Sequence, residues 1–237
     1  MMEKTIRSFD DLMIMLDQRF RSPEQFWDPF YTNRERPVPF FKSAPDETLV
    51  SYFTKKLIKS GKAMDLGCGP GRNSIYLAQQ GFDVAGYDIS RVAIQWAQER
   101  AMEKGLHINF ECKSVFELDV VGEYDLVYDS GCLHHLLPHR RVQYLEMIYQ
   151  SLKSTGLFGI TCFRPGFGGL GGPEREMSDW DVYEEGTMNG GLAFSEEKIK
   201  YILEPYFDCI EFRAVNESDN DDMFGVPFLW GSLWKKK

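Results

Sequence analysis

One stretch of the chain decides its fold, Ala63-Met64-Asp65-Leu66-Gly67-Cys68-Gly69-Pro70-Gly71-Arg72-Asn73. Apolar residues at positions 63, 64 and 66 are typical of a short buried strand, and glycines at 67, 69 and 71 then allow a tight turn. An apolar helical run begins after Asn73. Because a helix N-terminus offers free N–H groups and a partial positive charge, this arrangement favours a bound carboxylate or phosphate. The alternative is an ordinary strand–helix joint with glycines for packing.

The composition indicates a globular protein that does not bind nucleic acid. The 237 residues are 43% apolar, enough for one large domain or a domain with an extension. A net charge of −9 argues against a nucleic-acid partner, which normally needs a basic surface. The 5 cysteines form no C-x-x-C pair, which favours a reducing cytoplasm. No signal-peptide core or run of membrane-spanning length is expected.

Strand and helix patterns alternate from residue 62 onward. Buried strands are expected at 62–66, 83–87, 107–112, 124–128 and 157–163, with helices between most of them. Such βα repeats predict an α/β fold with a parallel sheet covered by helices on both faces. Two further strands, 207–214 and 224–234, are joined by a polar turn at 216–222 and predict an antiparallel hairpin. Pro227 should lie near the start of the last strand.

Two segments flank or interrupt this pattern. Residues 1–60 are expected to form a helical N-terminal cover, with Ser8 as a helix cap, a capping box at Ser22 and a helix over 46–59. Residues 61–237 then form the main domain. Within it, the glycine-rich segment 165–193 leaves the end of the fifth strand and is predicted to be a lid.

The glycine spacing and the next strand indicate a nucleoside ligand. Arg72 stands where the dinucleotide fingerprint G-x-G-x-x-G has its last glycine, which weakens a nicotinamide or flavin interpretation. Asp88 closes the second strand and can accept both hydroxyls of a ribose, and Ile89 beside it can face a base. Ser114 and the backbone of Val115 can read an adenine edge.

The fourth strand ends beside the first, at the crevice where open α/β sheets bind ligands. Asp129, Ser130 and Gly131 lie at this end and are expected to form the opposite wall of the site. His134 or His135 is a candidate general base, and the alternative is a loop with one packed and one solvated histidine. A metal site at these histidines is not expected, because there is no cysteine partner and Pro138 interrupts any shared helical face.

The stretch 64–73, Asp88 and the run Tyr124-Asp125-Leu126-Val127…Leu133-His134-His135-Leu136 resemble the class I S-adenosylmethionine-dependent methyltransferases. The resemblance covers about residues 50–163. It implies a Rossmann-like sheet of seven strands in the order 3-2-1-4-5-7-6, with strand 7 antiparallel. The aromatic segment from Trp27 to Phe41 is similar to the N-terminal cover of the small-molecule branch, which includes thiopurine and tellurite-resistance methyltransferases.

The resemblance also implies roles for residues of the cofactor site. The methionine moiety would lie on the glycine turn, the ribose beside Asp88, and the adenine near the end of the third strand, where many members carry an acid in place of Ser114. The residues expected at the cofactor are Asp65 (near its ammonium), Gly67, Cys68, Gly69, Asn73, Asp88, Ile89, Ser114, Val115, Phe116, Asp129, Ser130 and Gly131. Trp27 and Tyr31 are candidates to stabilise the sulfonium cation.

The sequence therefore predicts methyl transfer from S-adenosylmethionine to a small molecule. An in-line displacement on an activated methyl needs proximity, alignment and exclusion of water, and no catalytic triad. Two other functions stay open at this stage: an NAD(P)-dependent oxidoreductase, and a protein that senses S-adenosylmethionine without catalysis. The residue pattern leaves the oligomeric state open.

Overall fold

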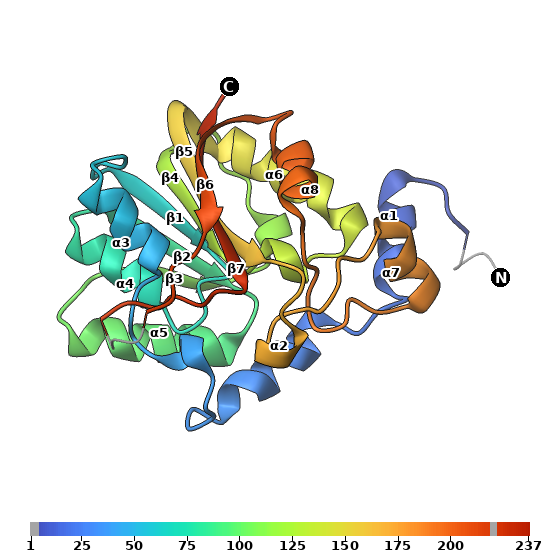
Figure 1. The fold of residues 1–237 in the computed structure, drawn as a ribbon, viewed down its shortest axis with the longest axis horizontal. Helices are drawn as coiled ribbons and strands as arrows, with labels where there is room; N and C mark the ends of the chain where they lie inside the picture. Colours follow the sequence, from blue (N-terminus) through green and yellow to red (C-terminus); the bar gives the residue numbers. More distant parts are fainter. Residues whose placement is uncertain (1–4, 219–221) are drawn as a thin grey trace.

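The computed structural model describes residues 5–218 and 222–237, and its centre is a mixed β-sheet (Figure 1). The 7 strands have the order β3-β2-β1-β4-β5-β7-β6. The strands are β1 (Lys62–Leu66), β2 (Asp83–Asp88), β3 (Asn109–Cys112), β4 (Tyr124–Ser130), β5 (Leu152–Phe163), β6 (Phe207–Ala214) and β7 (Leu229–Lys236). Strand β7 pairs antiparallel with both β5 and β6, and the other pairings are parallel. The predicted fold class and strand order are confirmed.

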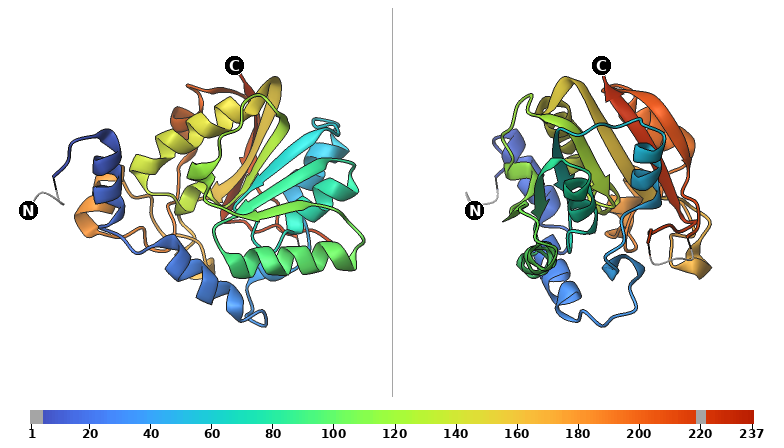
Figure 2. Two further views of the ribbon diagram at one scale, coloured as in Figure 1. Left: turned by 180° about the vertical axis from the view of Figure 1, so that it is seen from behind. Right: turned by 90° about the vertical axis from the view of Figure 1, so that its left-hand side faces the viewer.

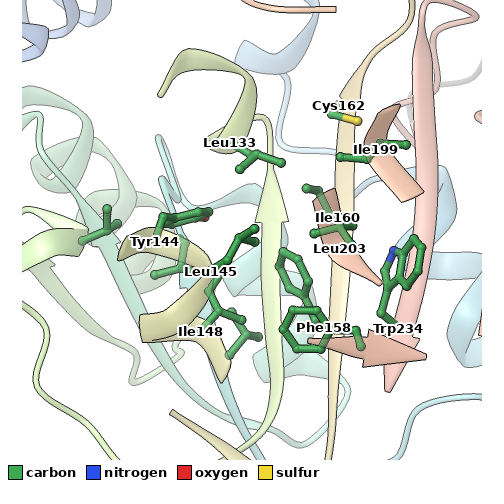
Figure 3. Packing of buried hydrophobic residues seen from close by; sticks show 14 of the residues in the cluster. Leu133, Tyr144, Leu145, Ile148, Phe158, Ile160, Cys162, Ile199, Leu203 and Trp234 are labelled. Atoms are coloured by element: carbon green, nitrogen blue, oxygen red, sulfur yellow. The ribbon is translucent and has the colours of Figure 1, made fainter. Parts of the chain in front are cut away.

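Helices cover both faces of the sheet. Figure 1 shows α3 (Glu47–Thr54), α4 (Arg72–Gln79) and α5 (Arg91–Glu103) on one side, and α6 (Pro138–Ser151) and α8 (Glu196–Leu203) on the other. Side chains alternate along each strand, so Ala63 packs with the α3–α4 side and Met64 with the α6–α8 side. Figure 3 shows the hydrophobic cluster on the α6–α8 side, in which Phe158 lies between Tyr144 on one side and Trp234 on the other.

The N-terminal helices lie along the end of the sheet where the parallel strands finish. Helix α1 (Phe9–Asp17) lies beside the short helix α7 (Asp179–Glu185), as both views of Figure 2 indicate. Helix α2 (Pro23–Thr32) lies beside helix α5, and Asp28 of α2 accepts a hydrogen bond from the backbone N–H of Val92 there. Asp17 of α1 accepts a hydrogen bond from Arg140 and contacts His139, both at the start of α6. Single turns of 3-10 helix occur at Pro39–Phe41, Val115–Glu117, Leu133–His135 and Gly168–Leu170.

Several sequence predictions of local structure need correction. Ser8 caps α1 as expected, but Ser22 makes no cap hydrogen bond because its hydroxyl donates to the Glu24 carboxylate instead. The helix expected over 46–59 is shorter, since Lys56 adopts a positive φ of 59° just after α3.

The C-terminal predictions shift as well. Strand β5 begins at Leu152 rather than 157, and a register shift in its pairing with β4 makes room for the extra residues. Strand β7 begins at Leu229 rather than 224, so Pro227 precedes it. The predicted polar turn includes residues 219–221, which lie outside the described residues. Segment 165–193 contains helix α7 as well as the glycine-rich loop. In the part of the chain that the structure describes, no helix has the length and apolar character needed to cross a bilayer.

Candidate functional site

The glycine turn after β1 brings backbone close to other elements. Gly67, Gly69 and Gly71 have φ values of 63°, 52° and 78°, which glycine adopts without the strain that a side chain would add. A Cβ on Gly71 would lie 2.9 Å from the Cβ of Ala97 in α5, so this glycine lets α4 begin against α5. The turn therefore presents backbone N–H groups at the N-terminus of α4.

Asp88 holds this turn in place. Its carboxylate accepts a hydrogen bond from the backbone N–H of Gly69 at 2.8 Å and another from that of Ser90, also at 2.8 Å. Burial raises the pKa of Asp88 to about 6 despite these bonds. Each carboxylate oxygen can accept a second hydrogen bond, so Asp88 can support the turn and still accept from a ligand hydroxyl.

Asp65 carries a carboxylate oxygen that lacks a partner. The side chain is 1% exposed, and its Oδ2 accepts a hydrogen bond from the Ser74 hydroxyl at 2.5 Å. Its Oδ1 is buried and has no hydrogen-bond partner among the described residues. Burial raises the pKa of Asp65 to about 7. A buried carboxylate oxygen without a partner is costly, so this group is suited to a cationic ligand.

A buried ion pair next to the glycine turn was not predicted from the sequence. The Arg72 guanidinium contacts the Asp46 carboxylate at 2.6 Å and donates to the Ser130 hydroxyl at 2.7 Å. Asp46 also accepts hydrogen bonds from the Asn73 amide and the Tyr128 hydroxyl. Arg72 thus links the start of α4 to the start of α3 and to the end of β4. Its position just after the last glycine was the available signal.

These elements enclose a cavity of about 370 Å³ at the ends of the parallel strands. Its volume lies within the range of small-molecule sites. Residues predicted from the sequence that line it are Trp27, Tyr31, Asp65, Gly67, Cys68, Gly69, Asn73, Asp88, Ile89, Ser114, Val115, Phe116, Ser130, Gly131, His134 and His135. The structure thus brings together residues from α2, β1, α4, β2 and β4 and from the loops that follow β1, β2, β3 and β4.

Asp129 is the exception and needs correction, since it is not among the residues that line the cavity. Its carboxylate accepts hydrogen bonds from the backbone N–H groups of Cys132 and Leu133 and from the Tyr144 hydroxyl. The side chain is fully buried and points to the α6 side of the sheet, because alternation along β4 places it opposite Tyr128. The carboxylate of Asp129 therefore stabilises the turn after β4 and does not line the cavity.

The two candidate bases differ in their surroundings. The ring of His134 stacks on Phe163 at 3.8 Å, and its Nδ1 accepts a hydrogen bond from the Phe163 backbone N–H at 3.3 Å. This bond makes Nδ1 the acceptor and places the proton of the neutral ring on Nε2, so His134 has no free lone pair for a base. Burial lowers the pKa of His135 to about 4, which keeps it neutral and weakly basic. His135 is the stronger candidate of the two.

Some cavity residues were not predicted from the sequence. Lining residues that were not predicted include Phe163 and Thr161 near the end of β5, Cys132 after β4, and Phe224, Phe228 and Leu229 before and at the start of β7. The end of β5 could have been included, because all parallel strands finish at the same edge. The 224–229 loop reaches the cavity only through the folding of the terminal hairpin.

Comparison with known proteins bears on what this site binds. A family model described as a methyltransferase domain matches residues 63–156, which run from β1 into β5 and include most of the polar residues of the site. Residues 63–156 therefore form a methyltransferase domain, and the sheet has the strand order that the class I resemblance implied. Such a domain is consistent with S-adenosylmethionine as cofactor, which the sequence resemblance implied.

Relatives of the methyltransferase domain extend this finding. An uncharacterized methyltransferase of Schizosaccharomyces pombe is 37% identical over 86 residues, which are 34% of this chain and 59% of that protein. The chain thus spans little more than half the length of this relative.

Solved structures share the fold over nearly the whole chain. One of them is described in connection with the conversion of a disulfide bond into a thioacetal group during echinomycin biosynthesis. It has a TM-score of 0.71 and 19% identity, and the match covers 91% of this chain and 92% of that chain. The Burkholderia thailandensis 1,6-didemethyltoxoflavin-N1-methyltransferase, with its namesake ligand and S-adenosylhomocysteine bound, has a TM-score of 0.61 and 20% identity and covers 98% and 92%. At these identities the likeness concerns the fold.

Proposed function

We propose that this protein binds S-adenosylmethionine in the cavity above β1, β2 and β4 and transfers its methyl group to a small molecule. The observation that carries the proposal is the buried Oδ1 of Asp65, which has no partner among the described residues. Asp65 is one of the residues that line the cavity beside the glycine turn. The methionine end of the cofactor offers an ammonium group, which would supply the missing hydrogen bond and offset the buried charge.

The other cavity residues fit the remaining parts of the cofactor. Asp88 would accept hydrogen bonds from the ribose hydroxyls while keeping its bonds to the backbone of Gly69 and Ser90. Ile89, Val115 and Phe116 offer apolar surface for a base. Trp27 and Tyr31 of α2, whose rings stack at 5.9 Å, would cover the sulfonium from the opposite side. The bound cofactor supplies a methyl group on a positively charged sulfur.

The chain's own part in catalysis is then orientation and exclusion of water. Helix α2 and the loop before β7 both border the cavity, so a bound acceptor would be enclosed from two sides. The enclosed volume favours a small acceptor, and the toxoflavin methyltransferase of the same fold is named for such a substrate. Neither the fold nor the family match supports the oxidoreductase alternative.

Titration calorimetry with S-adenosylhomocysteine and with NAD tests cofactor binding. We expect S-adenosylhomocysteine to bind and NAD to give no heat of binding. Asp65→Asn should weaken the S-adenosylhomocysteine affinity, whereas Asp83→Asn, at the exposed start of β2, should leave it unchanged. Binding of NAD alone would refute the proposal.

Catalysis itself is tested with methyl-labelled S-adenosylmethionine and a panel of thiols, amines, phenols and heteroaromatic compounds. Transfer of label to one of them is expected. Binding of the cofactor without transfer to any compound would instead favour the sensor alternative.

A further inference from the structure

The cavity has two halves of different chemistry. The half above β1 and β2 contains the glycine turn, Asp65 and Asp88. The half above β4 and β5 is lined by His135, Phe163 and Phe228, and we refer to these three residues as the aromatic wall. Because the proposed cofactor fills the first half, the second half is where a methyl acceptor would lie.

Rings from four segments of the chain meet in this second half. Phe163 lies 6.0 Å from His135 and 6.2 Å from Phe228, measured between ring centroids. Trp27 of α2 approaches His135 edge-on, with centroids 4.9 Å apart and planes at 78°. Trp27 also stacks on Tyr31, which lies against Gly69. It therefore stands where the two halves join, above the point at which a methyl group would pass between them.

Two ionisable side chains that line the cavity near the aromatic wall, those of Arg72 and His134, already have hydrogen-bond partners. The Arg72 guanidinium is paired with Asp46 and donates to Ser130. Nδ1 of His134 accepts a backbone hydrogen bond. A charged ligand in this half would lose its hydration without gaining a free counter-charge from these side chains.

The same groups offer little basicity. His135 stays neutral because burial lowers its pKa to about 4, and such a weak base cannot efficiently take the proton of an alcohol or an alkylammonium group near neutral pH. An acceptor in this half must therefore attack with a lone pair that is already available.

We propose that the methyl acceptor is an uncharged, flat, conjugated ring compound whose accepting atom carries a free lone pair, held between Trp27 and the aromatic wall. The inference rests on the proposed methyltransferase function. The lone pair of the acceptor atom forms the new bond to the methyl carbon while the carbon–sulfur bond breaks and its electron pair returns to sulfur. The positive charge passes from sulfur to the acceptor, where it is delocalised over the conjugated ring.

The test uses the protein saturated with S-adenosylhomocysteine and three matched probes in titration calorimetry at pH 7.5. Quinoline is flat and uncharged, decahydroquinoline is saturated and cationic, and quinoline-2-carboxylate is flat and anionic. We expect quinoline to bind at least about tenfold more tightly than the other two. Equal or tighter binding of either charged probe would overturn the inference.

Variants separate the aromatic wall from the cofactor half. Phe228→Leu should weaken quinoline binding about fivefold or more and change S-adenosylhomocysteine binding less than twofold. Phe9→Leu, at a side chain of α1 that is 71% exposed, should change neither and serves as the matched control. His135→Phe should keep the quinoline affinity, because the ring face is retained, and a tenfold loss would assign recognition to an imidazole nitrogen and refute the inference.

The two proposals fail in different ways. Absence of S-adenosylhomocysteine binding would overturn the proposed function and this inference together. Normal S-adenosylhomocysteine binding without a preference for quinoline would overturn this inference alone.

Discussion

The unpartnered carboxylate of Asp65 makes cofactor affinity depend on pH in a calculable way. Its pKa is about 7 in the free protein because it is buried, and the ammonium of S-adenosylhomocysteine would lower this pKa in the complex. Binding then requires the ionised form and releases a proton from the protonated form. Affinity should therefore rise with pH up to about 7 and level off above it, as long as the ligand's amino group stays protonated.

The magnitude follows from the fraction of Asp65 that is ionised. With a pKa of about 7, roughly 3% is ionised at pH 5.5 and roughly 75% at pH 7.5, which is an affinity change of about 25-fold. Asp88, with a pKa of about 6, adds about fourfold if the ribose requires its ionised form. Asp65→Asn should remove the pH dependence of about 25-fold that is due to Asp65 and keep the dependence of about fourfold that is due to Asp88. At pH 7.5 it should also weaken binding about 10- to 100-fold by loss of a charge-assisted hydrogen bond.

The assay is titration calorimetry with S-adenosylhomocysteine at both pH values, in two buffers that differ in ionisation enthalpy. Wild-type protein should release a proton on binding at pH 5.5, and the Asp65→Asn variant should release less. If the variant retained the full wild-type pH dependence, the ammonium contact and the assignment of this titration to Asp65 would both be wrong.

Asp65→Asn should weaken cofactor binding but raise the stability of the folded chain. The pKa of Asp65 is higher in the folded chain than its ordinary value of 3.8, so the unfolded chain loses its proton first as pH rises. Folding stability should therefore fall between about pH 4 and pH 7 on account of this group. Without cofactor, Asp65→Asn should melt several degrees above wild type at pH 8, with a smaller gap at pH 4. A scanning calorimetry gap that did not shrink at low pH would contradict this linkage.

Three further substitutions probe the framework of the site. Gly71→Ala should lower the free energy of unfolding, measured in urea melts, by about 2–4 kcal/mol, because its φ is 78° and the new Cβ would meet a neighbour at 2.9 Å. The control Gly105→Ala, which has open space around it, should lower the free energy of unfolding by only about 1 kcal/mol. Equal losses would argue against close packing at Gly71. Arg72→Met should lower the free energy of unfolding by about 3–5 kcal/mol, because it leaves the buried Asp46 carboxylate unpaired. The control Lys55→Met, which breaks a partly exposed ion pair, should lower it by less than about 1 kcal/mol. A small effect at Arg72 would mean that its carboxylate partner is protonated. Asp88→Asn should weaken S-adenosylhomocysteine binding about 10- to 100-fold, and unchanged affinity in the folded variant would remove Asp88 from the ribose.

Sequence alone determined the architecture and the floor of the site. Alternating strand and helix patterns, the glycines at 67–71 and the terminal hairpin are local features, and each is strong enough to predict its own element. Because parallel strands finish at one edge of a sheet, the residues that follow β1, β2 and β4 had to lie near one another. Asp65, Asp88 and Ser130 could therefore be assigned to the cavity before any contact was known.

Tertiary structure decided the direction of side chains and the composition of the second half of the cavity. Asp129 ends a correctly predicted strand, yet alternation turns it toward α6, where two backbone N–H groups and Tyr144 occupy its oxygens. The ion pair of Arg72 and Asp46 depends on how α3 packs against α4, and its sequence signal is limited to the position of Arg72 just after the last glycine.

The aromatic wall arises in the same way from long-range packing. His135, Phe163 and Phe228 belong to segments far apart in the sequence, and they meet only because β5 and β7 pair beside β4. Local sequence patterns encode which elements form, because each depends on neighbouring residues. The chemistry of the acceptor half depends on which elements become neighbours, and that is set by the packing of the whole sheet.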